Sequence, residues 1–100
     1  VYTATKAAID AVVKVAAQTG AARGIRVNYL ALGVVDTPMA RQDRPDGLDE
    51  KARMEFLVGL HPLGRLGEAS EVATAALSIL RQEWTTGSVM TMDGGLSCQP

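Results

Sequence analysis

Residues 25–35 read IRVNYLALGVV, a run rich in β-branched and apolar side chains that carries no helix-capping signal. Such a run is typical of a strand buried on both faces, and we expect a strand from about Ile25 to Ala31. A second run, SVMTM at 88–92, is closed by the turn sequence DGG at 93–95. It predicts a shorter second strand.

Three helices are expected around these strands. The first extends from Tyr2 to about Ala22, a stretch rich in alanine and free of proline. The second begins at the cap residue Asp49 and reaches about Leu60. The third covers residues 68–83. Two strands joined by a helical connection predict a right-handed parallel β-α-β unit, and therefore an α/β fold.

The spacing of apolar residues predicts which helix faces are buried. In the first helix, polar residues recur every fourth position and leave the remainder apolar: Lys6, Asp10, Lys14 and Gln18. Asp10 and Lys14 are expected to form an exposed ion pair one helical turn apart. The inward residues expected in the second helix are Met54, Leu57 and Val58, and those in the third are Val72, Ala73, Ala76, Leu77 and Leu80.

Composition is typical of a globular protein and excludes several function classes. Of the 100 residues, 47% are hydrophobic and 21% charged, and ten basic against eleven acidic residues give a net charge of -1. Because there is no basic block and no long uninterrupted apolar stretch, we expect neither a nucleic-acid partner nor a membrane span. The single cysteine, Cys98, and the lack of a signal sequence indicate a cytoplasmic protein.

A two-stranded parallel sheet is too small for a complete domain of this kind. It cannot cover the first helix and the connecting helices, and at least one flank would expose unpaired backbone N–H and C=O groups. No linker, repeat or low-complexity tract divides residues 1–100. We therefore expect a single fragment, the C-terminal end of something larger.

The residues with the clearest chemistry stand at the start of the chain. Tyr2 and Lys6 are four residues apart, so on a helix they present a phenol and an ammonium group to one site. A cation about 4 Å from the phenol favours the phenolate by about 4 kcal/mol at an effective dielectric constant of about 20, before desolvation subtracts from it. The tyrosine then becomes usable as a general acid or base. Taken alone, such a pair is more often an ordinary surface contact.

Further motifs follow in order: YTATKAAID at 2–10, GIRVN at 24–28, Gly33 with Thr37 four residues later, PLGRLGEASEVA at 62–73, TG at 86–87 and DGG at 93–95. Together they resemble the C-terminal half of a short-chain dehydrogenase/reductase, and the resemblance covers nearly the whole chain. It implies a Rossmann-like sheet that binds NAD or NADP. It also implies hydride transfer between the nicotinamide and a small carbonyl or alcohol substrate.

The resemblance assigns roles to five residues. Tyr2 matches the family's general acid/base, and Lys6 matches the lysine that lowers the tyrosine pKa and orients the nicotinamide ribose. The segment that holds the nicotinamide carboxamide and the phosphates is matched by Gly33, Val35 and Thr37, and Val35 is expected to act through its backbone. No metal site is expected.

Several positions keep a second interpretation. Leu32 stands where the family most often has proline, so its φ angle is not fixed by a ring and a looser grip on the cofactor is expected. Without the family, Gly33 reads as a turn residue, and Thr37 followed by Pro38 reads as a helix N-cap and N1 pair.

Residues between the two motif-rich regions carry weaker signals. The segment Met39–Leu60 matches the family's variable substrate loop and contains the turn sequence RPDG at 44–47. It is either a mobile lid over the cofactor or an ordinary solvent-exposed loop. Asn28 is expected to satisfy neighbouring backbone groups. His61, before Pro62, reads as a loop histidine outside the site.

Two parts of the family pattern are absent: the glycine-rich turn after the first Rossmann strand, and the serine about a dozen residues before the tyrosine. We therefore expect a truncated or split polypeptide that is inactive alone and binds NAD or NADP weakly or not at all. The choice between NAD and NADP and the identity of the substrate are not specified. A second interpretation is a non-catalytic association module whose apolar first helix pairs with another copy of the chain or with a missing N-terminal half.

Overall fold

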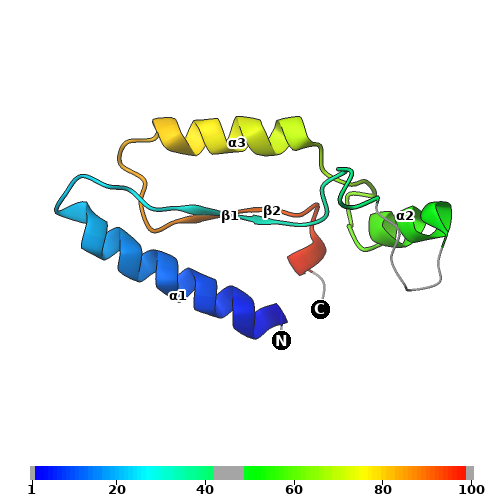
Figure 1. Ribbon diagram of the computed structural model, residues 1–100, viewed down its shortest axis with the longest axis horizontal. Coiled ribbons are helices and arrows are strands. Elements are labelled where there is room, and N and C mark those ends of the chain that lie inside the picture. Colours follow the sequence, from blue (N-terminus) through cyan, green and yellow to red (C-terminus); the bar gives the residue numbers. More distant parts are fainter. Residues whose placement is uncertain (1, 42–48, 99–100) are drawn as a thin grey trace. The chain divides into compact units, whose positions relative to one another are not determined.

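A computed structural model describes residues 2–41 and 49–98, apart from the side chains of Tyr2 and Thr3 (Figure 1). Its elements are α1 (Tyr2–Ala21), β1 (Tyr29–Leu32), α2 (Glu50–Gly59), α3 (Ala69–Arg81), β2 (Val89–Met92) and the short 3-10 helix η1 (Leu96–Cys98). The expected α/β class is confirmed. The expected turn at 44–47 lies outside the described residues. In the described part of the chain, no helix is both long enough and apolar enough to cross a membrane.

The two strands form a parallel pair. The Tyr29 N–H donates to the Ser88 carbonyl and the Gly33 N–H donates to the Met92 carbonyl, each at 3.0 Å. Both strands therefore advance by four residues in the same direction between these two bonds. Beyond the strands, an isolated parallel bridge joins Val35 to Gly67.

The first strand starts later than predicted, because residues 25–28 are joined to residues 85–88 by one backbone bond, from the Gly87 N–H to the Val27 carbonyl at 2.7 Å, and otherwise by side chains. The Val27 N–H donates to the Thr86 hydroxyl at 3.1 Å. The Asn28 side chain accepts from the Ser88 N–H at 3.0 Å and donates to the Thr85 carbonyl at 3.0 Å. The expectation of a strand from Ile25 was thus wrong, and the role expected for Asn28 is confirmed.

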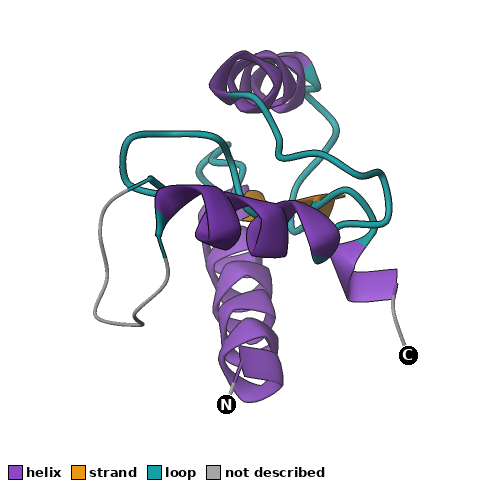
Figure 2. Ribbon diagram, turned by 90° about the vertical axis from the view of Figure 1, so that its right-hand side faces the viewer, coloured by secondary structure: helices purple, strands orange, loops and turns teal. Residues whose placement is uncertain are grey.

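The chain forms two compact units, and each is described by itself. Unit 1 contains Val1–Leu30 and Ala76–Met90; unit 2 contains Ala31–Ala75 and Thr91–Pro100. Within unit 1, α1 lies on one side of the paired strand segments and the C-terminal half of α3 lies on the other (Figure 1). Much of unit 2 is loop, and α2 lies entirely within it (Figure 2).

An arginine closes the C-terminal end of α3 in unit 1. The Arg26 guanidinium donates to the carbonyls of Ile79 and Thr85, each at 3.2 Å, and to that of Leu80 at 2.7 Å. These carbonyls include groups that a helix leaves unsatisfied at its C-terminus, where a positive charge is also favourable. The helix ends at Arg81, two residues before the predicted end.

One face of α1 is buried in unit 1. Val13 is 8% exposed and Ala17 is 5% exposed, and helical spacing puts Lys6 and Asp10, both half-buried, on the same face. The predicted pair is present, with the Lys14 ammonium 3.1 Å from the Asp10 carboxylate. The opposite face is apolar and open.

The predicted inner faces of the other helices need correction. In α3 the half-buried positions are Val72, Ala75, Ala76 and Ile79, whereas Ala73, Leu77 and Leu80 are exposed. The buried stripe is thus shifted by about one residue from the predicted one. The prediction could not separate the two, because neighbouring stripes of a helix rich in alanine and leucine are equally apolar. In α2, Met54, Leu57 and Val58 are half-buried, but the most buried side chain is Arg53, which is 8% exposed.

Charged groups hold the N-terminus of α3 in unit 2. The Glu71 carboxylate accepts the Glu68 N–H at 3.0 Å and two Arg65 guanidinium hydrogen bonds at 2.8 and 3.0 Å. This is one half of a capping box, in which a side chain satisfies a free N–H group at the start of the helix. The hydrogen bonds from Arg65, followed by the one from Glu68, lower the pKa of Glu71 from 4.5 to about 2.

The substitution Glu71→Gln is expected to loosen the first turn of α3 near neutral pH. Because the folded pKa is depressed, the contribution of the carboxylate is complete above about pH 4.5 and is lost as the pH falls through about 2. Amide exchange at residues 68–72 should therefore rise by about threefold to tenfold in the variant at neutral pH, with the difference vanishing near pH 2. The exposed Glu83→Gln serves as the control, and equal exchange in Glu71→Gln and wild type at neutral pH would contradict the assignment.

Candidate functional site

The predicted catalytic pair lies in the first two turns of α1. The helix begins at Tyr2, and Lys6 follows one turn later with its side chain half-buried. Helical spacing puts both positions on the face that also carries Val13 and Ala17. The Tyr2 side chain lies outside the described residues, so the contact between phenol and ammonium stays a prediction.

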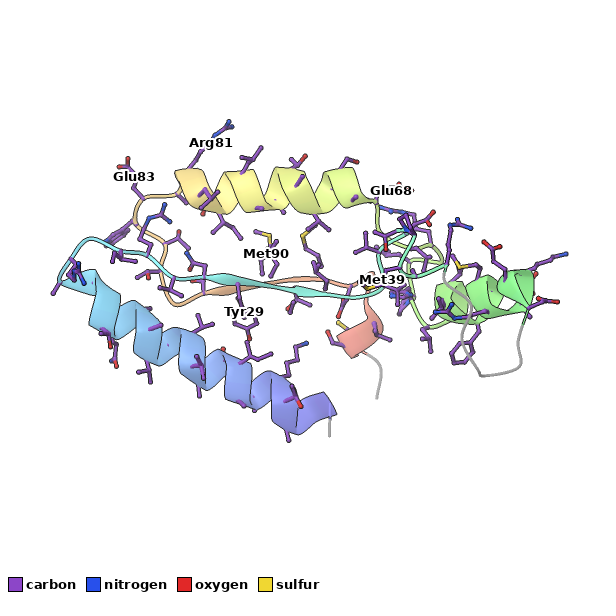
Figure 3. The ribbon with its side chains drawn as sticks, viewed as in Figure 1. Tyr29, Met39, Glu68, Arg81, Glu83 and Met90 are labelled. Carbon is purple, nitrogen blue, oxygen red and sulfur yellow. The ribbon has the colours of Figure 1, made fainter. Side chains whose placement is uncertain are left out.

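The other tyrosine of unit 1 is unsuited to the acid/base role. Tyr29 projects from β1 toward α1 (Figure 3), where its hydroxyl donates to the Asp10 carboxylate at 3.4 Å. Burial, together with the adjacent negative charge of Asp10, raises the pKa of Tyr29 above its ordinary value of 10.0. A phenol shifted in this direction stays protonated at neutral pH and cannot act as a base.

Gly33 follows β1 in unit 2, at a point where the chain leaves no room for a side chain. A Cβ atom there would lie 2.7 Å from His61 Nε2 and 2.9 Å from Asp93 Cα. The φ angle of Gly33 is not positive. Glycine is therefore required for close packing, and the interpretation of Gly33 as a simple turn residue is wrong.

The N–H and the C=O of Val35 both point away from Gly67. The Gly67 N–H donates to the Val34 carbonyl at 3.1 Å, and the Asp36 N–H donates to the Gly67 carbonyl at 2.8 Å. Because trans peptide groups point their N–H and C=O in opposite directions, the Val35 N–H and C=O lie on the far side of the bridge. Neither group has a partner within residues 2–41 and 49–98. One donor and one acceptor of the same residue are thus available to a ligand.

Thr37 caps a turn. Its hydroxyl accepts from the Ala40 N–H at 3.4 Å, and its carbonyl accepts from the Ala40 and Arg41 N–H groups. The expected N-cap geometry is therefore present at Thr37 and Pro38, but the described residues 38–41 form a turn and not a helix.

An ion-pair network ties this loop to α2. The Arg41 guanidinium holds both Asp36 carboxylate oxygens, at 2.8 and 3.0 Å, and reaches Glu50 at 3.3 Å. The Arg41 hydrogen bonds lower the pKa of Asp36. Arg41 thereby ties Asp36 to the first residue of α2. Asp49, accepting the Ala52 N–H at 2.7 Å, is the predicted N-cap of α2.

His61 is buried against the segment that follows β1, which its sequence context did not indicate. It is 3% exposed, its Nε2 accepts the Val34 N–H at 3.1 Å, and its Nδ1 lies 2.7 Å from the Leu57 carbonyl. His61 lies in a bend after α2, as expected for a loop histidine, and its place outside the cofactor contacts stays a prediction. Its burial was not expected. The available signal was a lone histidine between the end of a helix and a proline, and this pattern is too common to indicate a role.

Next to these groups, unit 2 has an open hollow of about 610 Å³. Its walls come from the Val34–Val35 segment, the 61–72 connection and the C-terminal turn, and include His61, Leu66, Val72 and Met92. Among the described residues, no group of three or more histidine, cysteine, aspartate or glutamate side chains is placed to hold a metal ion.

The predicted site residues divide between the two units. Lys6 and the Tyr2 position belong to unit 1, and Gly33, Val35 and Thr37 belong to unit 2. Within unit 2, one continuous segment carries Gly33, Val35 and Thr37. It is anchored by hydrogen bonds to β2, His61, Gly67 and α2.

Comparison with known families and proteins gives consistent matches. The family model described as "Enoyl-(Acyl carrier protein) reductase" matches residues 1–97. The chain is 40% identical over 96 residues to "Carbonyl reductase family member 4" of Danio rerio, with 96% of this chain and 37% of the relative covered. It is 41% identical over 97 residues to a 3-oxoacyl-[acyl-carrier-protein] reductase of Thermotoga maritima, with 95% and 37% covered. The chain thus spans about 37% of the length of these curated relatives.

Solved structures with the same fold include two dehydrogenases. A short chain dehydrogenase family protein from Francisella tularensis superposes with a TM-score of 0.81 at 28% identity, covering 98% of this chain and 43% of that one. A small-chain dehydrogenase in complex with NADPH superposes with a TM-score of 0.77 at 34% identity, covering 93% and 41%. Each match includes nearly all of this chain and less than half of the other.

The substitution Gly33→Ala is expected to lower the free energy of unfolding by about 1–3 kcal/mol, because its Cβ has to displace backbone at Asp93 and the His61 ring. Urea denaturation followed by far-UV circular dichroism measures the loss. Gly59→Ala is the matched control, since a Cβ there meets nothing within 4 Å and the φ angle is negative. It should leave stability unchanged or raise it by up to about 1 kcal/mol. Equal stabilities for the two variants would contradict the packing argument.

Proposed function

Because the chain belongs to the short-chain dehydrogenase/reductase family, we propose that it is the C-terminal half of an NAD(P)-dependent oxidoreductase that interconverts a carbonyl and an alcohol. The observation that carries this proposal is the orientation of the Val35 peptide groups, which leaves one N–H and one C=O directed away from the Gly67 bridge. A primary carboxamide, such as that of nicotinamide, has the complementary acceptor and donor. The structural relative in complex with NADPH supports the choice of cofactor class.

Tyr2 is the proposed general acid and base, and Lys6 its electrostatic partner. A bound nicotinamide cofactor would supply a hydride to the carbonyl carbon in the reducing direction and would accept one from the alcohol carbon in the oxidising direction. The Tyr2 phenol donates its proton to the carbonyl oxygen, so that the product is a neutral alcohol. In the oxidising direction, the phenolate takes the hydroxyl proton back. The Lys6 ammonium stabilises the phenolate in both directions and orients the cofactor ribose.

Gly33, Val35 and Thr37 are proposed to hold the cofactor. Gly33 lets the chain pass close to His61 and Asp93, which fixes the start of the segment. Val35 offers its backbone donor and acceptor, and the Thr37 hydroxyl, at the first position of the turn, offers a donor to a phosphate or to the carboxamide. The substrate class is a small carbonyl compound or alcohol, consistent with relatives named as carbonyl and 3-oxoacyl reductases.

The open edge of β1 is proposed to receive a strand from an N-terminal nucleotide-binding half. Tyr29 and Gly33 direct their N–H groups to β2, so alternation along the strand directs those of Leu30 and Leu32 the opposite way. No strand pairs with that edge in the described residues. Leu32 supplies an N–H that a proline would lack, which gives an added strand one further hydrogen bond. Without that half, we propose, the chain is inactive and binds cofactor weakly.

An association module is the second candidate function, favoured by the outer face of α1. Ile9, Val12 and Val15 are 47%, 67% and 61% exposed. Exposed apolar side chains on one helix face are a typical surface for pairing with a second copy of the chain. The exposed free thiol of Cys98 agrees with the reducing, cytoplasmic compartment that we propose for either function.

Tyr2→Phe tests the catalytic proposal. The chain is co-expressed with the N-terminal half of a family member, and NADPH or NADH oxidation is followed by absorbance with a panel of ketones and 3-oxoacyl thioesters. Tyr2→Phe should lower kcat by about 100-fold to 10,000-fold while cofactor binding, measured by fluorescence, is retained. Tyr29→Phe should stay within about twofold of wild type, because the Tyr29 hydroxyl is hydrogen-bonded to Asp10. Full activity of Tyr2→Phe in a cofactor-binding assembly would disprove the assignment.

Val12→Asp tests the association module. If α1 pairs with a second copy of the chain, this charge weakens self-association at least about tenfold, because burying an unpaired carboxylate is costly. Sedimentation equilibrium of the chain alone measures the change, and Gln18→Asp on the polar stripe of the same helix is the control. A folded wild-type chain that is monomeric at every concentration would argue against the module.

A further inference from the structure

We propose that His61 is a positioning residue that fixes the Gly33–Val34 peptide and thereby aims the Val35 backbone at the cofactor carboxamide. This inference rests on the proposed function, and it adds a residue that touches neither substrate nor cofactor. It is carried by two hydrogen bonds of the His61 ring and by two glycines that surround it.

The hydrogen bonds define the state of the imidazole ring. Nε2 lies 3.1 Å from the Val34 nitrogen and must accept, since a backbone N–H can only donate. Nδ1 lies 2.7 Å from the Leu57 carbonyl oxygen and must donate, since a carbonyl can only accept. The bound ring is therefore neutral, with its proton on Nδ1. It links the last turns of α2 to the segment after β1.

The His61 ring accepts the Val34 N–H, a group that no backbone carbonyl accepts among the described residues. The Gly33 N–H is held by the Met92 carbonyl, and the peptides on both sides of Val35 are held by Gly67. Between them, the Val34 N–H has the His61 ring as its partner. Four consecutive peptide groups are thus fixed, three by backbone and one by the imidazole.

Two glycines shape the slot for the ring. A Cβ at Gly33 would lie 2.7 Å from His61 Nε2, and one at Gly94 would lie 3.3 Å from His61 Cβ. Gly94 also has a φ angle of +58°, which favours glycine. Gly33 brings backbone freedom to the peptide that His61 holds, so this peptide can rotate once the ring is lost. A rotated Gly33–Val34 peptide would tilt the Val35 donor and acceptor that follow it.

Two variants separate the bond to Val34 from the bond to Leu57. His61→Gln retains an acceptor at the reach of Nε2 and can still bond the Val34 N–H. His61→Asn retains a donor at the position of Nδ1 and loses the acceptor. We expect amide exchange at Val34 to rise at least about tenfold in His61→Asn and to stay within about threefold of wild type in His61→Gln. Nitrogen-15 spectra of wild type should show the Nδ1–H tautomer.

Cofactor kinetics supply the functional readout. In the assembly with a supplied N-terminal half, KM for NADPH or NADH should rise about tenfold in His61→Asn while kcat changes less than about twofold, and His61→Gln should restore most of the affinity. A merely structural histidine would move stability alone, which urea denaturation of the same variants measures. If KM for the cofactor rises in the variant with faster amide exchange at Val34, and stays low in the variant with slow exchange, His61 acts by positioning the peptide.

Three outcomes overturn the inference. The first is a wild-type ring protonated on Nε2, the second is equal Val34 exchange in wild type and His61→Asn, and the third is an unchanged KM despite faster exchange. Exchange and tautomer are measured without cofactor, so they remain informative if the proposed function fails. A wild-type assembly that binds neither NADPH nor NADH, but shows the expected Val34 exchange, disproves the proposed function and with it the cofactor role of His61.

Discussion

The backbone from Gly33 to Asp36 is held by hydrogen bonds to three other parts of unit 2, at Met92, His61 and Gly67. Parallel pairing ends at Gly33, yet the peptides that follow remain fixed by His61 and by Gly67. This matters because a recognition site made of backbone needs its peptide planes set before a ligand arrives. Rigid anchoring on one side leaves the opposite side with a defined donor and acceptor at Val35. The cofactor contact proposed for the Val35 backbone depends on this arrangement.

Side chains replace regular backbone pairing at several points of the fold. Before the regular strands begin, the side chains of Asn28 and Thr86 continue the contact between the two segments, together with the backbone bond from Gly87 to Val27. Arg26 satisfies the end of α3, and Glu71 satisfies its beginning. Such contacts are specific to their residues, so they set where each element starts and stops. They also explain why a small sheet of two strands has well-defined ends.

The sequence predicted those features that depend on local preference. The alanine-rich stretch from Tyr2, the Asp49 cap and the turn sequence after Met92 each act through neighbouring residues, and each was located within one or two positions. The inner face of α3 was misassigned because Leu77 and Leu80 are as apolar as the residues that face inward. Burial of that face is decided by contacts distant in sequence, which spacing alone does not report. The same holds for His61, whose partners Leu57 and Val34 lie four and 27 residues away. The geometry of the Tyr2–Lys6 pair stays a prediction.

One edge of β1, which no strand covers among residues 2–41 and 49–98, has a consequence for the chain in solution. Leu30 and Leu32 combine apolar side chains with outward N–H groups on a strand that has no charge and no proline to block it. Any extended segment can form backbone hydrogen bonds with such an exposed edge, including the same strand of a neighbouring molecule. When the chain is produced without a covering strand, sideways growth into aggregates competes with correct assembly. Solubility therefore depends on how soon that edge is covered.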